Sequence, residues 1–403
     1  MGNLLMIFCV IDVLSVCILR LRIERRKIMS IYPWIEKIDF QKFAMPLVVK
    51  RDNEYYPGIV EKLADLVFEL ERCGASDKIV LAVKEYRKKI ISSIILYYQG
   101  DLVDAQLIVN EMLDEFNDAA PAITDINSSI AFPGGGPDYS EVQFFRARLS
   151  ENVVEFSSED MLHIPFNKRH IVKSERFSIP GLPCLYLGNS SYACWVEMGC
   201  PADHRFNVAP ILLDNTQKVL NLTVSISALY AFNESENTLS ESENENYVIS
   251  LLKLFVLTLC TSYKVEETNR NFKSEYILPQ MLMLACKRRK LDGITYYSKQ
   301  IPSELLACNV GVNLVLFAKY NGEESLSEIC QHLEVGTSFN FALFKQLLPC
   351  QLYKTYELRA LSTPYINNVG TKNHFFPYTE TQFFEFDKYL FANWHRDWTI
   401  PTL

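Results

Sequence analysis

Hydrophobic residues recur every three or four positions between residues 57 and 117, a spacing that predicts amphipathic helices. A first helix is expected from about Pro57 to Gly74, a second from Ser76 or Asp77 to Gly100, and a third from Asp101 onward. A glycine just past the last apolar position is a common end of a helix. The pattern predicts a small helical domain, since no second copy follows at a fixed period to indicate a repeat array.

Residues 118–140 break this pattern with prolines and glycines in a polar setting. The three glycines Gly134 to Gly136 would suit a phosphate-binding loop only if a helix opening with Lys-Ser or Lys-Thr followed, and none does. We therefore expect a linker here, with a helical domain over residues 29–117 before it and a second domain over residues 141–403 after it.

Short strand-like runs alternate with helical stretches in the second domain, which predicts an α+β fold. The strand candidates are residues 142–149, 184–188, 209–213, 218–222, 293–297 and 312–318, and the helix candidates are residues 191–198, 247–263 and 276–290. The acidic, low-complexity residues 233–246 predict a solvated loop, and the apolar run after them predicts a buried helix. The C-terminal extension is rich in aromatic residues between Phe339 and Trp394, which are expected to be core residues and not a platform for a ligand.

The composition and charge of the chain argue against metal binding and nucleic-acid binding. The 403 residues are 49% hydrophobic and carry a net charge of −8, which fits a globular chain and gives no uniform basic field for nucleic acid. The 11 cysteines show no Cys-x-x-Cys spacing, which indicates reduced packing residues and a cytoplasmic protein. The histidines show no metal-binding spacing, because Pro165 interrupts the pair His163 and His170. We expect neither a metal site nor a nucleic-acid partner.

The first 28 residues allow three interpretations. Leu4 to Leu19 is an apolar run that carries Asp12 and precedes several basic residues, as in a membrane anchor. It is short for a span, which needs about 20 residues, so a buried or membrane-associated helix is also open. Translation from Met29 would remove the segment. Membrane contact through residues 4–19 is the less favoured outcome.

Five ordered segments carry the chemistry of the second domain. They are Phe144-Phe-Arg-Ala-Arg148, Arg176-Phe-Ser-Ile-Pro-Gly-Leu-Pro-Cys-Leu-Tyr-Leu187, Trp195-Val-Glu197, Tyr276-Ile-Leu-Pro-Gln280 and Asp292-Gly-Ile-Thr-Tyr-Tyr-Ser298. Over roughly residues 140–320 their order resembles the RES domain, a family that is named for its Arg, Glu and Ser residues and includes bacterial toxins that degrade NAD. The resemblance implies a mixed α/β domain similar to ADP-ribosyltransferases, in which a split sheet clasps NAD.

The resemblance also implies roles for individual residues. Glu197, Arg146, Tyr186 and Ser298 match the catalytic set, and NAD would be bound by Arg146, Arg148, Arg176, Tyr186 and Ser298. Arg148 is an alternative to Arg146, because side chains two apart on a strand share a face. Many members have Gly-Arg-Phe-Asn where this chain has Glu175-Arg-Phe-Ser178, a departure that affects the contacts around Ser178.

These residue types suit cleavage of the bond between nicotinamide and ribose. Nicotinamide leaves as a neutral ring and needs no general acid, so a single carboxylate, Glu197, suffices to stabilise positive charge on the ribose. Arginine forks bind a pyrophosphate in a bidentate manner, a tyrosine ring stacks, and a serine donates a hydrogen bond. Each residue also has a purely structural explanation, as a surface charge, a core ring or a helix cap.

We therefore expect an NAD-consuming enzyme, a glycohydrolase or phosphorylase that takes NAD as its substrate, needs no cofactor and acts as a toxin or defence effector. The alternatives are a protein ADP-ribosyltransferase and a catalytically inactive interaction or scaffold protein. The expected partner is an antitoxin, or else the helical domain regulates the enzyme in cis.

Overall fold

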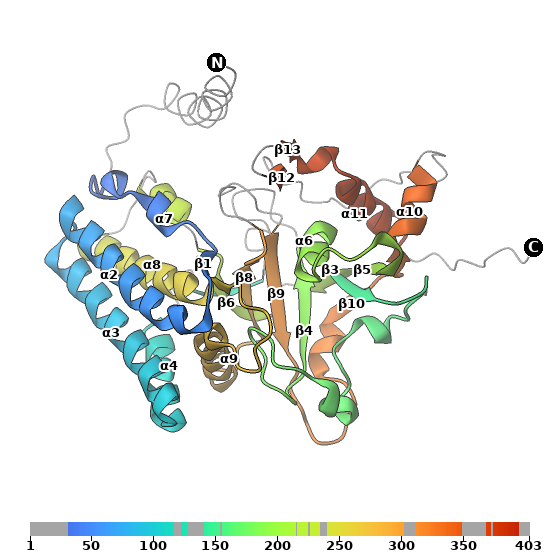
Figure 1. Ribbon diagram of the computed structural model, residues 1–403, viewed down its shortest axis with the longest axis horizontal. Helices are drawn as coiled ribbons and strands as arrows, with labels where there is room; N and C mark the ends of the chain where they lie inside the picture. Colours follow the sequence, from blue (N-terminus) through green and yellow to red (C-terminus); the bar gives the residue numbers. More distant parts are fainter. Residues whose placement is uncertain are drawn as a thin grey trace, which may run out of the picture.

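A mixed sheet runs through the centre of the molecule, with helices on both sides of it (Figure 1). The computed structural model describes residues 31–116, 122–126, 141–153, 155–214, 216–224, 226–233, 240–301, 311–348, 368–371 and 374–394. Within them the fold combines helices and sheet, as the sequence predicted. The first 28 residues, and most of the predicted linker, lie outside the described residues.

The strands of this sheet follow the order β10-β5-β3-β4-β9-β8-β6-β2, and β11 also pairs with β5. Their bounds are Ile123–Asp125 (β2), Glu141–Leu149 (β3), Cys184–Gly188 (β4), Phe206–Asp214 (β5), Lys218–Leu222 (β6), Gly293–Tyr297 (β8), Val312–Phe317 (β9), Leu333–Val335 (β10) and Phe339–Asn340 (β11). The strands predicted at residues 184–188, 218–222 and 293–297 are confirmed residue for residue. Among the described strands of this sheet, β6 and β8 run parallel and the other pairs antiparallel.

The sheet opens between β3 and β4. In the described chain a single backbone pair, Phe145 with Gly188, joins these two strands, whereas β3 pairs with β5 along its whole length and β4 does so with β9. Beyond that pair, residues 146–149 of β3 and 184–187 of β4 are adjacent without a ladder between them. A sheet that separates in this way exposes side chains of both strands to one cavity.

The three helices expected at the N-terminal end are confirmed as α2 (Tyr55–Cys73), α3 (Asp77–Gln99) and α4 (Leu102–Asp114). Gly74 and Gly100 follow the first two in the left-handed conformation, each with φ of 87°, which glycine adopts without strain. Ser76 caps α3 by accepting a hydrogen bond from the Ile79 N–H at 3.3 Å.

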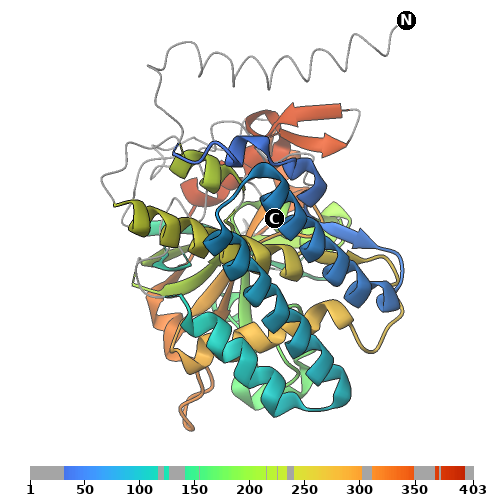
Figure 2. The same cartoon turned by 90° about the vertical axis from the view of Figure 1, so that its left-hand side faces the viewer.

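These helices are not a separate unit, in contrast to the predicted helical domain. One hydrophobic core contains Leu63 of α2 and Val83 of α3 together with Leu252 of α8 (Glu241–Thr261), Leu282 of α9 (Ile277–Arg288) and Ile294 of β8. Figure 2 shows α2, α3 and α4 in front of α8 and the sheet. The apolar spacing revealed that each helix buries one face but not which element covers it.

Two short strands tie the same region to the rest of the chain. Strand β1 (Leu47–Val49) pairs in parallel with β7 (Tyr263–Val265), and β2, within the predicted linker, pairs with β6. The part of the linker that the structure describes is therefore a strand of the sheet.

The loop predicted over residues 233–246 is wrong for its second half. Helix α7 (Ile226–Asn233) precedes it, and α8 begins at Glu241, where Ser240 and Glu243 form a capping box. Acidic residues are favourable in the first turn of a helix. The acidic composition of this segment therefore indicates exposure to solvent, and does not indicate a loop. The rest of α8 is the expected buried helix.

Aromatic residues of the C-terminal extension are buried, as the sequence predicted. Phe341 and Phe344 of α10 (Phe341–Leu347) and Phe386 and Tyr389 of α11 (Gln382–Ala392) are buried against β3 and β5. A small hairpin of β12 (Asn368–Thr371) and β13 (His374–Pro377) precedes α11. No described helix is both long and apolar enough to span a bilayer.

Candidate functional site

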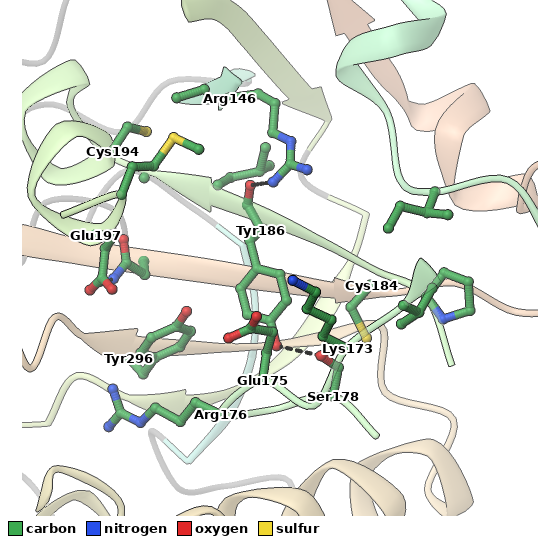
Figure 3. Close-up of a pocket in the computed structure, with 18 of the residues that line it drawn as sticks. Arg146, Lys173, Glu175, Arg176, Ser178, Cys184, Tyr186, Cys194, Glu197 and Tyr296 are labelled. Carbon is green, nitrogen blue, oxygen red and sulfur yellow. Dashed lines mark hydrogen bonds between the residues drawn. The ribbon is translucent and has the colours of Figure 1, made fainter. Parts of the chain in front are cut away.

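A cavity of about 500 Å³ lies where β3 and β4 separate, within the size range of ligand pockets. It is lined by Arg146, Arg176, Tyr186 and Glu197, four of the six residues singled out in the sequence, and Figure 3 shows their side chains around it. The other charged residues in the described lining are Lys173, Glu175 and Lys299.

Arg146 enters the cavity from β3. One guanidinium nitrogen, Nη1, donates to the Tyr186 carbonyl oxygen of β4 at 2.8 Å, and this bond bridges the opening of the sheet. The buried Nε finds no partner among the described residues. Burial and the nearby Arg148 lower the pKa of Arg146 to about 10, so it is a cation at neutral pH, and none of the described carboxylates forms an ion pair with it.

Glu197 is the last residue of α6 (Ser191–Glu197), which packs tightly on β4. A Cβ atom on Gly188 would come within 2.9 Å of Cys194 Sγ, so only glycine allows this approach. Ser190 caps the helix by accepting from the Ala193 N–H at 3.0 Å. At the other end Asn313 Nδ2 of β9 donates to Glu197 Oε1 at 2.8 Å and fixes the carboxylate, which remains exposed to the cavity.

Arg176 lies in a tight turn that is held from three sides. The backbone N–H groups of Glu175 and Ser178 donate to each other's carbonyl oxygens at 3.1 and 3.3 Å. The Tyr186 hydroxyl is 2.9 Å from Ser178 Oγ and accepts from the Phe177 N–H. Gln280 Nε2 of α9 lies 2.8, 3.0 and 3.1 Å from Ser174 Oγ and the carbonyl oxygens of Glu175 and Ser178. The turn is therefore rigid before any ligand binds.

The Arg176 guanidinium is buried between aromatic rings. Its Cζ lies 4.7 Å from the centroid of Tyr296 and 5.1 Å from that of Phe177, and Nη1 donates to the Tyr297 carbonyl oxygen at 2.9 Å. Burial lowers the pKa of Arg176, and Glu197 opposes this shift, so the two side chains interact electrostatically. Figure 3 shows Arg146 and Arg176 on opposite sides of the Tyr186 ring.

Two predicted residues do not line the cavity. Arg148 faces Asp160, 3.9 Å away, and its Cζ lies 5.8 Å from the Phe156 centroid. Ser298 is buried, and its Oγ accepts from the Gln300 N–H at 3.1 Å, a contact within a turn, since residues 299–301 are not helical. Lys299 and Gln300, directly after it, do reach the cavity.

Glu175 and Lys299 were missed as site residues, although each adjoins a residue that was named. Lys299 forms an ion pair with Glu275 at 3.7 Å, and its ammonium lies 4.7 Å from the Tyr276 centroid. Burial, together with Arg176, lowers its pKa to about 8. The pKa of Glu175 is raised, chiefly because the surrounding protein removes water from the carboxylate, although the side chain remains exposed to the cavity.

Cysteine and metal chemistry have little support at this cavity. Burial raises the pKa of the Cys184 and Cys194 thiols to about 12, so neither is a thiolate at neutral pH. No group of three or more metal-ligating side chains gathers in the described chain. His163 accepts from the Ser327 N–H at 2.9 Å and is a core residue.

Comparison with known proteins gives one similarity in sequence and one in structure. The chain is 37% identical over 163 residues to Putative toxin YopC of Bacillus subtilis (strain 168), which is 40% of this chain and 37% of that protein. It thus matches little more than a third of the relative's length. A crystal structure of the M. tuberculosis MbcT-MbcA toxin-antitoxin complex aligns over 59% of this chain and 96% of that chain, with 12% identity and a TM-score of 0.28, too low to support an argument. No protein-family model matches the chain. The chain is therefore similar, over part of its length, to a protein named as a toxin.

Proposed function

We propose that the protein is a toxin enzyme that consumes NAD by cleaving the bond between nicotinamide and ribose. The observation that carries the proposal is the Glu197 carboxylate, which Asn313 holds in a cavity that two arginines and a tyrosine ring also line. The partial similarity to a protein named as a toxin supports the cellular role.

The charges of the cavity suit a dinucleotide. Four cationic side chains and two carboxylates line its described part, which leaves an excess of positive charge for a pyrophosphate. Arg146 and Arg176 lie on either side of the Tyr186 ring, and this placement suits a ligand in which rings and phosphates alternate. Lys299 joins the anion-binding groups, and Ser298 positions Lys299 and Gln300 instead of touching NAD.

Glu197 acts on the ribose in this proposal. As the glycosidic bond breaks, its electron pair moves to the nicotinamide nitrogen and positive charge develops on the sugar ring. A carboxylate that is already held by a hydrogen bond stabilises that charge without reorganising. Because the leaving group is neutral, no second residue has to protonate it.

Incubation of the purified full chain with NAD, followed by mass spectrometry, tests the proposal. We expect release of nicotinamide by the wild type and a strong reduction in the Glu197→Gln variant. The mass of the other product identifies the acceptor as water, phosphate or a protein side chain. Failure of the folded wild type to release nicotinamide would refute the proposed function. The antitoxin and the cytoplasmic location stay predictions.

A further inference from the structure

A second carboxylate, that of Glu175, shares the cavity with Glu197 and has no part in the bond cleavage described above. Within the described residues it accepts no hydrogen bond, and no cation lies within ion-pair distance of it. Its backbone, in contrast, is fixed by Ser178 and Gln280. The backbone of Glu175 is thus held in place while its carboxylate faces the cavity without a partner in the described chain. Functional groups that contact a ligand are commonly held in this way.

We propose that Glu175 is the general base that takes a proton from a water molecule, so that water is the acceptor and the reaction is hydrolysis. This inference rests on the proposed function and names the acceptor that it leaves open.

The proposed step balances without another reactant. The water oxygen forms a bond to C1 of the ribose as the bond from C1 to the nicotinamide nitrogen breaks, and the bonding electrons leave with nicotinamide. The water proton moves to the Glu175 carboxylate and from there to solvent. The products are nicotinamide and ADP-ribose.

Electrostatics favours water over inorganic phosphate. A phosphate acceptor would have to approach the ribose beside two carboxylates, and like charges at close range repel each other. A neutral water meets no such barrier. The cations of the cavity are expected to be occupied by the pyrophosphate of NAD itself.

The surroundings of Glu175 also suit a base near neutral pH. Desolvation raises its pKa, and Glu197 adds to the shift, while Lys273, Lys299 and Lys173 oppose it. A raised pKa brings the carboxylate closer to the operating pH, where general bases are most effective. The charged and titratable groups that interact with Glu175 come from several elements. They are Lys173 on its own segment, Tyr186 on β4, Glu197 on α6, Lys273 and Tyr276 ahead of α9, and Tyr296 and Lys299 from β8 and its end.

The test compares Glu175→Gln and Glu175→Ala with the wild type and with Glu323→Gln, which changes an exposed carboxylate outside the cavity. Nicotinamide release is measured from pH 5 to 9, with and without inorganic phosphate, and the products are identified by mass. We expect a loss of about 10²-fold in both Glu175 variants, disappearance of the acidic limb of the pH profile, and wild-type behaviour of the control.

Sodium azide separates a chemical role from a structural one. Azide attacks without losing a proton, so it should restore nicotinamide release by Glu175→Ala and yield ADP-ribosyl azide. A variant that is inactive because its turn has collapsed would not be rescued. The inference is overturned if the Glu175 variants keep the wild-type rate, if azide gives no rescue, or if the wild type forms ADP-ribose phosphate in phosphate buffer. Absence of nicotinamide release by the wild type would instead remove the proposed function.

Discussion

Replacement of Glu197 by glutamine removes the charge from the site and leaves its shape. Glutamine keeps the length of the side chain, and its amide oxygen can still accept the hydrogen bond that Asn313 Nδ2 donates at 2.8 Å. The loss is therefore that of the preorganised negative charge. A contact of this kind contributes about 10²–10³ in turnover, or roughly 3–4 kcal/mol of transition-state stabilisation. Glu197→Asp keeps the charge but withdraws it by one methylene, so we expect a smaller loss.

Two measurements check this prediction. Single-turnover release of nicotinamide reports the chemical step, and calorimetric titration with carba-NAD, which cannot be cleaved at the glycosidic bond, reports binding. Glu197→Gln should bind carba-NAD almost as the wild type does and should unfold at a similar temperature. Near-full cleavage by this variant would show that the central carboxylate is wrongly assigned, and a loss of binding equal to the loss of rate would show that Glu197 holds the ground state.

Three further predictions concern the surroundings of the site. Because the pKa of Lys299 is lowered to about 8, affinity for carba-NAD should fall as the pH rises from 7 to 9, and Lys299→Met should abolish this dependence in calorimetry. Burial raises the pKa of Asp387 from 3.8 to about 7, so between about pH 4 and 7 the folded chain binds a proton there that the unfolded chain does not. The free energy of unfolding should therefore fall as the pH rises through that window. Thermal unfolding of Asp387→Asn, measured over the same pH range, should lack this fall. A chain that begins at Pro137 should be insoluble instead of more active, because α8 and α9 would lose the helices that cover them; a soluble, active product in a sedimentation and NAD-cleavage assay would contradict the shared core.

Local elements were predictable because their signals are local. Short apolar or alternating runs predicted the bounds of β4, β6 and β8 correctly, and Gly74 and Gly100 indicated the ends of two helices. Residues 241–246 show the limit of composition: most of the run is exposed, although Asn244 is buried, yet Ser240 and Glu243 start a helix there. The spacing of Ser240 and Glu243 already indicated a capping box, and this signal for a helix start is stronger than the low complexity that suggested a loop.

The site was predictable only in part, since its contacts join distant segments. Asn313 meets Glu197 across 116 positions of sequence, through the register of β9 and the placement of α6 on β4. Gln280 reaches the turn of Arg176 from α9 in the same way. Nothing in the spacing of single residues indicates such pairs. Glu175 was visible as a departure within a named segment, and its role depends on the cavity that the separated strands create.

The regions before and after the sheet each support one of the two carboxylates. Asp387 of α11 accepts from the Ser191 N–H at the start of α6 and from the Tyr378 hydroxyl, so the C-terminal extension fixes the helix that ends at Glu197. Gln280 of α9, which shares its core with α2, α3 and α4, fixes the turn that carries Glu175. The N-terminal helices share a core with the helix that fixes this turn, so we expect their removal to disturb the site. Under the proposed function, we expect an antitoxin to act by covering the cavity or by displacing one of these two supports.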